Sequence, residues 1–257
     1  MRILGIDLGS REVKLVLLVN GEITRKYKIS TMKFYRDYCK QGNCLAVDLD
    51  KLDIGNIDAA VSTGYGRNNY ELAEFKPINE LKAHVYGVFY QLKLKNFILL
   101  DIGGQDVKVV KVEKGIITDM ELNDKCAASS GRYIENMASL LEIPIEELTS
   151  RWENPLLLNS TCSVFSESEL IGKISEGVPI ERLAASVNYS LYCRLEPLLS
   201  KLPGQRIVVT GGVALNQAII HYLQADYDEV LTVSDPQYNG AIGCCYYGKK
   251  FLDKGVI

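Results

Sequence analysis

The sequence predicts an α/β protein of two similar lobes, chiefly because it contains an internal repeat. Residues 4–23 (LGIDLGSREVKLVLLVNGEI) align without gaps with residues 98–117 (ILLDIGGQDVKVVKVEKGII) at an offset of 94. Each copy reads as an apolar strand, a D-x-G turn, a strand with alternating apolar residues and a turn containing Gly. A further strand, RIVVT at 206–210, runs into Gly-Gly and a helix. We expect lobes at residues 1–92 and 93–257, with the last helix a candidate to pack back on the first lobe.

Composition excludes several classes of protein. A formal net charge of −3 over 257 residues argues against nucleic acid as the main partner, because phosphate binding requires a basic face. No apolar run approaches the roughly 20 residues of a membrane span, and Asp7 interrupts any signal-peptide core. We therefore expect a cytoplasmic protein. The seven cysteines include no C-x-x-C pair, which argues against a self-contained zinc or ferredoxin-type site.

The two D-x-G turns have chemical meaning. Glycine lets the backbone approach a ligand closely, so that successive N–H groups can line an anion pocket. Asp7 and Asp101, at the preceding strand ends, can hold a hydrated Mg²⁺, which binds through few protein ligands. One such turn alone would favour a plain hairpin, but two aligned copies favour a site. The backbones expected to cradle phosphate are those of Gly9, Ser10, Arg11, Gly103 and Gly104.

Polar residues beside these turns have two readings each. Gln105 is neutral and follows the second turn, so it can orient a water molecule for attack or merely cap the turn. Lys14 and Lys108 occupy matched strand positions, where one can reach a phosphate or both can lie on a solvated face. Glu80 and His84 share one helical face; this pair can ligate a metal but is more often a hydrogen-bonded surface pair.

The last third of the chain contains a candidate binding segment for the part of a nucleotide that lies away from its phosphates. In RIVVTGGVALN, glycines after the strand would let the helix start pack closely against a nucleotide, although any strand–helix corner also favours glycine. Small residues at helical spacing follow at Gly240, Ala241 and Cys244 and suit close packing on the same site. The candidate nucleotide-binding residues here are Gly211, Gly212, Val213, Asn216 and Gln237.

Two cysteines are each expected to head an amphipathic helix. Cys126 precedes an apolar face that comprises Ala127, Ile134, Met137, Ala138 and Leu141. Cys162 precedes a helix whose apolar stripe comprises Val164, Ile171 and Ile174. Gly177 should end this helix. A thiolate is favoured at a helix N-terminus, and four thiolates are needed for a cubane cluster. A two-fold dimer would supply four thiolates, two from each chain, to an iron–sulfur cluster on the symmetry axis.

These motifs match known proteins in order and type. D-x-G-S, D-I-G-G-Q and T-G-G-V resemble the phosphate-1, phosphate-2 and adenosine motifs of the actin–hexokinase–Hsp70 ATPases. This resemblance implies a duplicated fold that binds ATP and Mg²⁺ in a cleft between two lobes. The superfamily contains kinases, chaperones and filaments, so the fold alone does not select a function.

A narrower resemblance covers NDKCAASSGRY, STCSVFSESELI, LDIGGQDVKVV and STGYGRN. These segments closely resemble the activators of 2-hydroxyacyl-CoA dehydratases, which are related to the ATPase subunits of benzoyl-CoA reductase and to reductases of double-cubane-cluster proteins. The resemblance implies a homodimer with one [4Fe–4S] cluster between subunits, ligated by Cys126 and Cys162. Such a protein passes low-potential electrons, from a ferredoxin or flavodoxin, to a partner iron–sulfur enzyme.

The sequence departs from the family pattern in two places. The family has A-A-G-T-G after the first cysteine, where this chain has Ser129 and Ser130 before Gly131; it also has G-S-T in the first loop, where this chain has Arg11. Two other functions stay open. A small-molecule kinase of the same fold could use Asp106 as its catalytic carboxylate and would be colourless, whereas a filament or nucleotide-gated binding module would sediment as polymer. Cys39 and Cys44 are interpreted as structural, and residues 63–67 (TGYGR) as a strand-to-helix corner.

Overall fold

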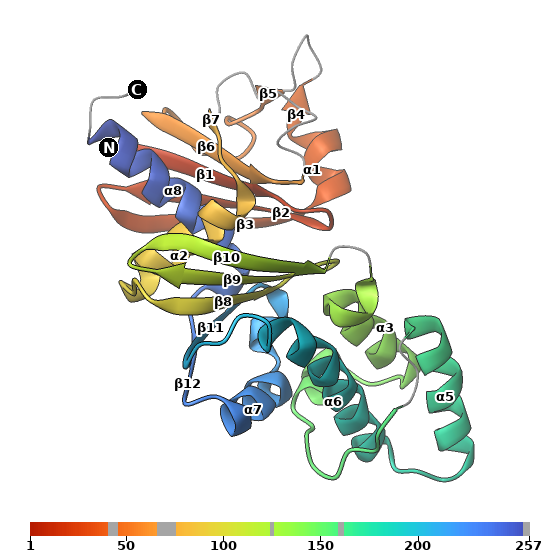
Figure 1. The fold of residues 1–257 in the computed structure, drawn as a ribbon. Coiled ribbons are helices and arrows are strands. Elements are labelled where there is room, and N and C mark those ends of the chain that lie inside the picture. The colour runs from red at the N-terminus through yellow and green to blue at the C-terminus, as the bar shows by residue number, and fades with distance from the viewer. Residues whose placement is uncertain (41–45, 66–75, 124–125, 159–161, 254–257) are drawn as a thin grey trace. The chain divides into compact units, whose positions relative to one another are not determined.

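The computed structural model describes residues 1–40, 46–65, 76–123, 126–158 and 162–253 (Figure 1). The chain divides into two compact units. Unit 1 comprises Met1–Leu94 and Val233–Ile257, and unit 2 comprises Lys95–Thr232. The C-terminal helix thus belongs with the N-terminal strands. Over the described ranges, no helix combines the length and the apolar composition that crossing a membrane requires.

Unit 1 contains a five-stranded mixed sheet in the order β3-β2-β1-β6-β7. The first three strands are antiparallel, and β6 and β7 continue the sheet in parallel with β1. Its strands are β1 (Arg2–Leu8), β2 (Glu12–Val19), β3 (Glu22–Ser30), β6 (Ala59–Gly64) and β7 (Lys76–Pro77), with a separate pair β4 (Cys39–Lys40) and β5 (Ala46–Val47). Its helices are α1 (Thr31–Asp37), α2 (Glu80–Leu92) and α8 (Asn239–Leu252).

The alternation along β1 explains the layers of unit 1. Leu4, Ile6 and Leu8 point to one face, where they pack in a cluster with Phe34 of α1. Ile3 points to the other face and packs with Ala241, Ile242 and Cys245 of α8. Asp7 follows the same alternation toward the α8 face, which places its carboxylate among α2 and α8 residues.

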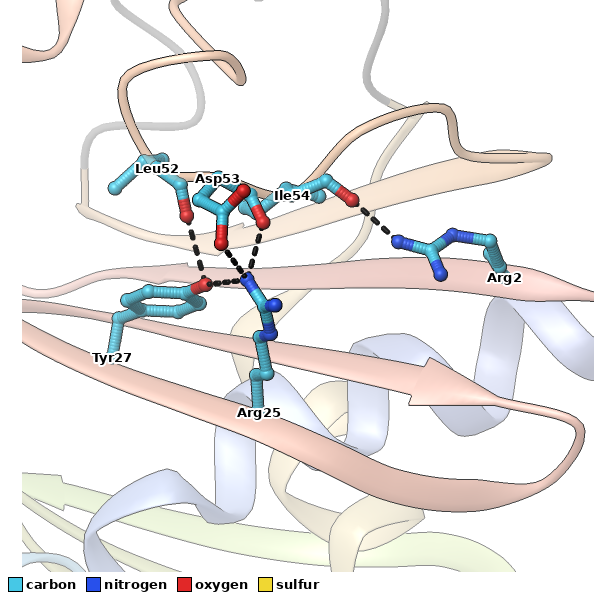
Figure 2. A network of polar contacts seen from close by, with 6 residues as sticks. All are labelled: Arg2, Arg25, Tyr27, Leu52, Asp53 and Ile54. Atoms are coloured by element: carbon cyan, nitrogen blue, oxygen red, sulfur yellow. Dashed lines mark hydrogen bonds and ion pairs between the residues drawn. The ribbon is translucent and has the colours of Figure 1, made fainter.

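The segment that leads from β5 to β6 is tied to the sheet by polar contacts (Figure 2). Arg25 on β3 donates from Nη1 to the Asp53 carboxylate at 2.8 Å and to the carbonyl of the same residue. The Tyr27 hydroxyl donates to Leu52 O at 2.8 Å, and Arg2 on β1 donates to Ile54 O. These contacts hold the crossing chain against β1 and β3, which fixes the approach to β6.

Unit 2 repeats the sheet plan of unit 1 in the order β10-β9-β8-β11-β12. Its strands are β8 (Phe97–Ile102), β9 (Val107–Glu113), β10 (Ile116–Asn123), β11 (Arg206–Thr210) and β12 (Glu229–Thr232). Its helices are α3 (Gly131–Leu140), α4 (Ile145–Thr149), α5 (Ser163–Ser175), α6 (Ile180–Leu199) and α7 (Gln217–Asp226). The helices α3, α5 and α6 contact one another (Figure 1).

The repeat seen in the sequence is a structural duplication. Asp7 on β1 pairs with Lys14 on β2, and Asp101 on β8 pairs with Lys108 on β9 in the same antiparallel register. The parallel strands also correspond, because Asp7 pairs with Thr63 of β6 and Asp101 pairs with Thr210 of β11. Each unit therefore places one aspartate at the same point of the same sheet.

The predicted helix faces are confirmed in one case and wrong in the other. On α3, Ile134, Met137 and Ala138 are buried in the unit 2 core, as the pattern predicted. On α5 the buried residues among those described are Ser166 and Leu170, whereas Ile171 and Ile174 of the predicted stripe are exposed. Part of the apolar surface of α5 therefore faces outward. The helix ends before Gly177, whose φ of +80° matches the predicted stop.

Candidate functional site

The acidic turn of unit 2 is built around Asp101, which is only 2% exposed. The Thr210 hydroxyl donates to Asp101 Oδ1 at 2.7 Å, and Lys108 Nζ lies 3.6 Å from Oδ2. The same ammonium lies 2.7 Å from Asp106 Oδ2. Lys108 is itself buried, so its reading as part of a solvated strand face is wrong. Its ammonium therefore places a positive charge beside both carboxylates.

The acidic turn of unit 1 places Asp7 beside two helices. A Cβ built on Gly240 of α8 would lie 2.7 Å from Asp7 Oδ2 and 3.1 Å from His84 Nε2 of α2. The carboxylate and the imidazole therefore both lie close to one point, which a side chain at residue 240 would occupy. His84 is 6% exposed, so its interpretation as part of a surface pair with Glu80 is wrong.

The lysines follow the duplication. Lys14 Nζ lies 3.7 Å from Glu12 Oε2, the position that corresponds to Asp106 in the repeat. In both units a lysine opposite the aspartate thus contacts an acidic residue two positions earlier in the strand or turn. Lys14 is partly exposed, with 19% of its side chain accessible, whereas Lys108 is enclosed.

A Thr-Gly pair ends the strand that runs parallel to β1 or β8 in each sheet, and it was missed as a repeat in the sequence. Gly64 and Gly211 have φ of +96° and +84°, a left-handed conformation that glycine adopts without steric cost. A Cβ there would lie 2.6 Å from Leu8 O and 2.3 Å from Ile102 O, respectively. The strand ends and acidic turns therefore approach too closely for a side chain. The offset differs from 94 because α3 to α6 intervene in unit 2.

The two turns expected to bind phosphate are held by different hydrogen bonds. In unit 2, Gly103 N donates to Asp106 O at 2.9 Å, and Gln105 is exposed at the tip of the turn. In unit 1, Thr31 Oγ1 donates to Gly9 O at 2.8 Å. Ser10 and Arg11 are exposed. Exposed N–H groups and side chains at a supported turn are able to bind an anion.

The residues expected at the adenosine end lie in different units. Gly211, Gly212 and Val213 follow β11 in unit 2, whereas Gln237 lies in unit 1, where its Oε1 is 3.4 Å from Lys28 Nζ. Asn216 is 2% exposed and caps α7 by accepting from Ile219 N at 3.2 Å. Its amide donates to Asn188 Oδ1 at 2.8 Å, so both ends of this side chain are hydrogen-bonded within unit 2.

The two motif cysteines are exposed, but only one begins an α-helix. Cys162 is the N-cap of α5, as predicted. Cys126 instead precedes a 3₁₀ turn over Ala127–Ser129, and α3 begins at Gly131, so the prediction that Cys126 heads this helix is wrong. The chain folds this way because the side chain of Asn123 accepts from Cys126 N at 3.3 Å and donates to Ser129 Oγ at 3.1 Å.

Three further cysteines differ in environment. Cys193 on α6 is exposed, whereas Cys244 and Cys245 are buried in unit 1. Burial raises the pKa of the Cys245 thiol to about 12, and the pKa of Cys244 is raised by burial and by the nearby Asp7 charge. Exposed thiols in unit 2 suit a soft metal centre, and buried, neutral ones do not.

Some predictions fall partly or wholly outside the described residues. Cys39 is half-buried beside the unit 1 core, consistent with a structural role, but Cys44 lies outside the described residues. Of the TGYGR segment, β6 ends at Gly64, and residues 66 and 67 are not among those described. The side chains of Ala127 and Val164, expected on the two apolar helix faces, also lie outside the described set.

Within the part of the chain that the structure describes, neither acidic turn nor the pair of Cys126 and Cys162 is grouped with enough further ligands to hold a metal ion. Among the residues that the structure describes, no three or more His, Cys, Asp or Glu side chains are grouped to hold a metal ion. Single carboxylates nevertheless suit Mg²⁺, which keeps most of its ligands as water and phosphate oxygens. Two exposed thiolates suit iron, and two further thiolates would complete a cubane.

Comparisons with known proteins agree over nearly the whole chain. The model of the BadF/BadG/BcrA/BcrD ATPase family matches residues 4–248. The 2-hydroxyisocaproyl-CoA dehydratase activator of Clostridioides difficile is 36% identical, covering 96% of this chain and 94% of its own. The (R)-2-hydroxyglutaryl-CoA dehydratase activating ATPase of Acidaminococcus fermentans is 34% identical, covering 96% of each chain.

Solved structures agree with the observed architecture. The C. difficile activator with bound ADPNP superposes with a TM-score of 0.85 at 32% identity, covering 99% of this chain and 97% of that one. A glucokinase of the ROK family from Streptomyces griseus superposes with a TM-score of 0.59 at 11% identity, covering 97% of this chain and all of its own. The likeness to the glucokinase concerns the fold alone, which is the duplicated two-lobed fold of the actin–hexokinase ATPases.

Proposed function

Because this chain belongs to the BadF/BadG/BcrA/BcrD ATPase family, we propose that it uses ATP hydrolysis to drive single low-potential electrons into a partner iron–sulfur enzyme. The partner is a 2-hydroxyacyl-CoA dehydratase or a double-cubane-cluster protein, and the donor is a ferredoxin or flavodoxin. The observation that carries the proposal is the exposure of Cys126 and Cys162 in the unit that also contains the Asp101 turn.

The ATPase half of the proposal rests on the duplicated turns. Asp7 and Asp101 would hold Mg²⁺, which neutralises charge on the β- and γ-phosphates during phosphoryl transfer. Exposed Gln105 would orient the attacking water, and Arg11 would meet phosphate charge. The phosphates would be bound by the backbones of Gly9–Arg11 and Gly103–Gly104, and the adenosine by the segment of Gly211, Gly212 and Val213, with Lys14, Asn216 and Gln237 supporting the site.

The electron-transfer half rests on the cysteines and on α5. Cys126 and Cys162 would supply two thiolates to a [4Fe–4S] cluster, which provides one-electron chemistry at low potential. A second copy of the chain would supply the other two. The helix that Cys162 caps exposes Phe165, Ile171 and Ile174, with Phe165 69% exposed. A homodimer that shares the cluster would remove this apolar surface from water.

The test is iron content in protein purified anaerobically. The native protein should be brown and contain about four irons per dimer. Cys126→Ala and Cys162→Ala should each abolish the cluster and loosen the dimer while ATP hydrolysis survives. Cys193→Ala is the matched control, because it removes another exposed thiol of unit 2 that lies outside the motifs. A motif variant that retained its iron would refute the ligand assignment, and a colourless, iron-free native protein would favour the kinase alternative.

A further inference from the structure

The phosphate turn of unit 2 is fastened to the chain that follows Cys126. Ser130 Oγ donates to Gly104 O at 3.0 Å, and Gly131 N donates to Gly103 O at 2.9 Å. A third bond, from Arg132 N to Gly104 O, is 3.1 Å long. Ser130 is fully buried, and the bond that its hydroxyl makes to the half-buried Gly104 is partly buried. Because Ser130 follows Cys126 closely in the chain, the turn and the cysteine segment form one hydrogen-bonded structure.

The same segment is joined to the second cysteine through one side chain of α6. Arg194 Nη1 donates to Ala128 O at 3.3 Å, and its Nη2 donates to Ser166 Oγ at 3.3 Å. The Ser166 hydroxyl donates in turn to Cys162 O at 3.0 Å, within the first turn of α5. The guanidinium also lies over the Tyr133 ring of α3, 4.5 Å from its centroid. The planar fork of arginine is suited to holding two acceptors at a fixed separation.

We propose that Arg194 is a positioning residue that holds the two cysteine segments as one body and, with Ser130, joins that body to the phosphate turn. This inference rests on the proposed function, since it gives the nucleotide a path to both cluster ligands. A displacement of the Gly103–Gly104 turn would move Ser130 and Gly131 directly. Through Ala128 and Arg194, it would also move the start of α5. Chains of hydrogen-bonded and packed side chains can carry such coupling, and the contacts above form one.

The arrangement also explains the two serines that depart from the family pattern. Ser130 stands where the family has threonine and keeps a hydroxyl for Gly104 O. Ser129 stands where the family has glycine, and it is buried with its hydroxyl bonded to Asn123. The departure therefore adds a side-chain contact at the base of the Cys126 segment and leaves the link to the turn in place.

The experiment measures how the two nucleotide states change thiol and cluster accessibility. In the cluster-free full-length protein, alkylation rates of Cys126 and Cys162 are followed with ADP and with a non-hydrolysable ATP analogue. In the cluster-loaded protein, iron chelation rates are followed with the same nucleotides. The native protein should show at least about a fivefold difference between the two states in each measurement, which lies in the usual range of coupling between sites.

The variants separate the link from a general structural effect. Arg194→Lys keeps the charge but loses the fork, and Arg194→Gln loses both; each should bring the ratio of rates to within about twofold of unity. Ser130→Ala should do the same. The controls are Ser130→Thr, which keeps the hydroxyl, and Arg182→Gln, which removes an arginine of α6 bonded to Asn154 O. Nucleotide affinity should stay within about twofold of native throughout.

The outcomes are decisive in both directions. A native ratio in Arg194→Gln, or equal rates in both nucleotide states of the native protein, would overturn the inference. If Arg194 variants fail to fold, Ser166→Ala removes the acceptor at the far end of the same link and replaces them. Native protein that contains no iron would overturn the proposed function alone, because alkylation of the cluster-free chain still tests the link.

Discussion

Asp7 and Asp101 occupy equivalent sheet positions but have different neighbours. Lys108 and Thr210 surround Asp101, whereas His84 lies beside Asp7. We expect Asp7→Asn or Asp101→Asn to lower ATP turnover at least about 100-fold, because each removes charge from the proposed Mg²⁺ site. Iron content should not change. The measurement is steady-state ATP hydrolysis, with thermal unfolding as a check because Asp101→Asn breaks a buried ion pair.

The matched control for these variants is Asp119→Asn, which removes an exposed carboxylate from β10 of unit 2. Turnover in this control should stay within about twofold of native, as is usual for surface changes away from a site. Native turnover in either Asp7→Asn or Asp101→Asn would show that the D-x-G turn concerned has no role in ATP hydrolysis.

Gly240 gives a second prediction at the level of single residues. Gly240→Ala would place a methyl group 2.7 Å from Asp7 Oδ2, which is too close for a Cβ contact, and 3.1 Å from His84 Nε2. The carboxylate must shift, so ATP turnover should fall at least about tenfold. Gly248→Ala, on the same helix, is also crowded, with contacts of 3.0 and 3.2 Å, but these are to the apolar Ile3 and Val61 side chains, and it should retain most of the turnover. Equal turnover in the two variants would contradict the importance of the Asp7 position.

Helix α5 shows where pattern reading succeeds and where it fails. Its start at Cys162 and its end before Gly177 were predictable, because cap and stop residues act locally. Its orientation was not predictable, since Leu170 is buried while Phe165 and Ile171 are exposed. A periodic pattern identifies the apolar face of a helix but does not say whether the same chain or another copy covers it.

The exposed side of α5 therefore gives a prediction about assembly. Phe165→Glu should shift the anaerobic protein toward monomer, because a charge would have to be buried at the proposed dimer interface. Monomer stability should change by less than about 0.5 kcal/mol, since the side chain is 69% exposed within its own unit. Sedimentation velocity measures the assembly. Met32→Glu, at an 81% exposed apolar residue of unit 1, is the control and should leave assembly unchanged. If Phe165→Glu formed a dimer of native affinity, the exposed face of α5 would be excluded as the dimer interface.

Helix α3 illustrates a boundary that the sequence could not locate. Its buried face was predicted correctly, but it starts at Gly131 and not at Cys126. Asn123 holds the intervening chain locally, but Ser130 is also bonded to Gly104 O, 26 residues earlier, and that contact forms only when the chain folds. The correction matters, because it places Cys126 on a segment fixed by the turn.

For the molecule as a whole, the duplication was visible and its full extent was not. Residues 4–23 and 98–117 share a constant offset, so an ungapped alignment finds them. The Thr-Gly ends of β6 and β11 are equally repeated in the structure, but the chain between β10 and β11 disrupts their spacing. The burial of Lys108 could not be predicted from the sequence either, because it depends on the contacts of its ammonium with Asp101 and Asp106.

Coupling to a partner is the prediction that belongs to the whole protein. If ATP and ADP favour different arrangements of the cysteine segments, the partner must distinguish them, because ligands shift equilibria only through differential affinity. We expect the partner enzyme to bind the ATP-like state at least about tenfold more tightly, or about 1.4 kcal/mol. Affinity is measured by anaerobic biolayer interferometry with ADP and a non-hydrolysable analogue. Equal affinities would leave hydrolysis without a mechanical output.

The chain between β10 and β11 distinguishes the two halves of this duplicated protein, and it is not an accessory to its unit. Residues 124–205 contain α3 to α6, where unit 1 has only residues 31–58 between the corresponding strands. Tyr133 and Leu191 from this stretch are buried in the same core as Leu100 of β8. An insertion that fills the core cannot be lost without unfolding its host. If the proposed electron transfer were lost in a related chain, its cysteines could therefore change while α3 to α6 were kept, because these helices are needed for folding.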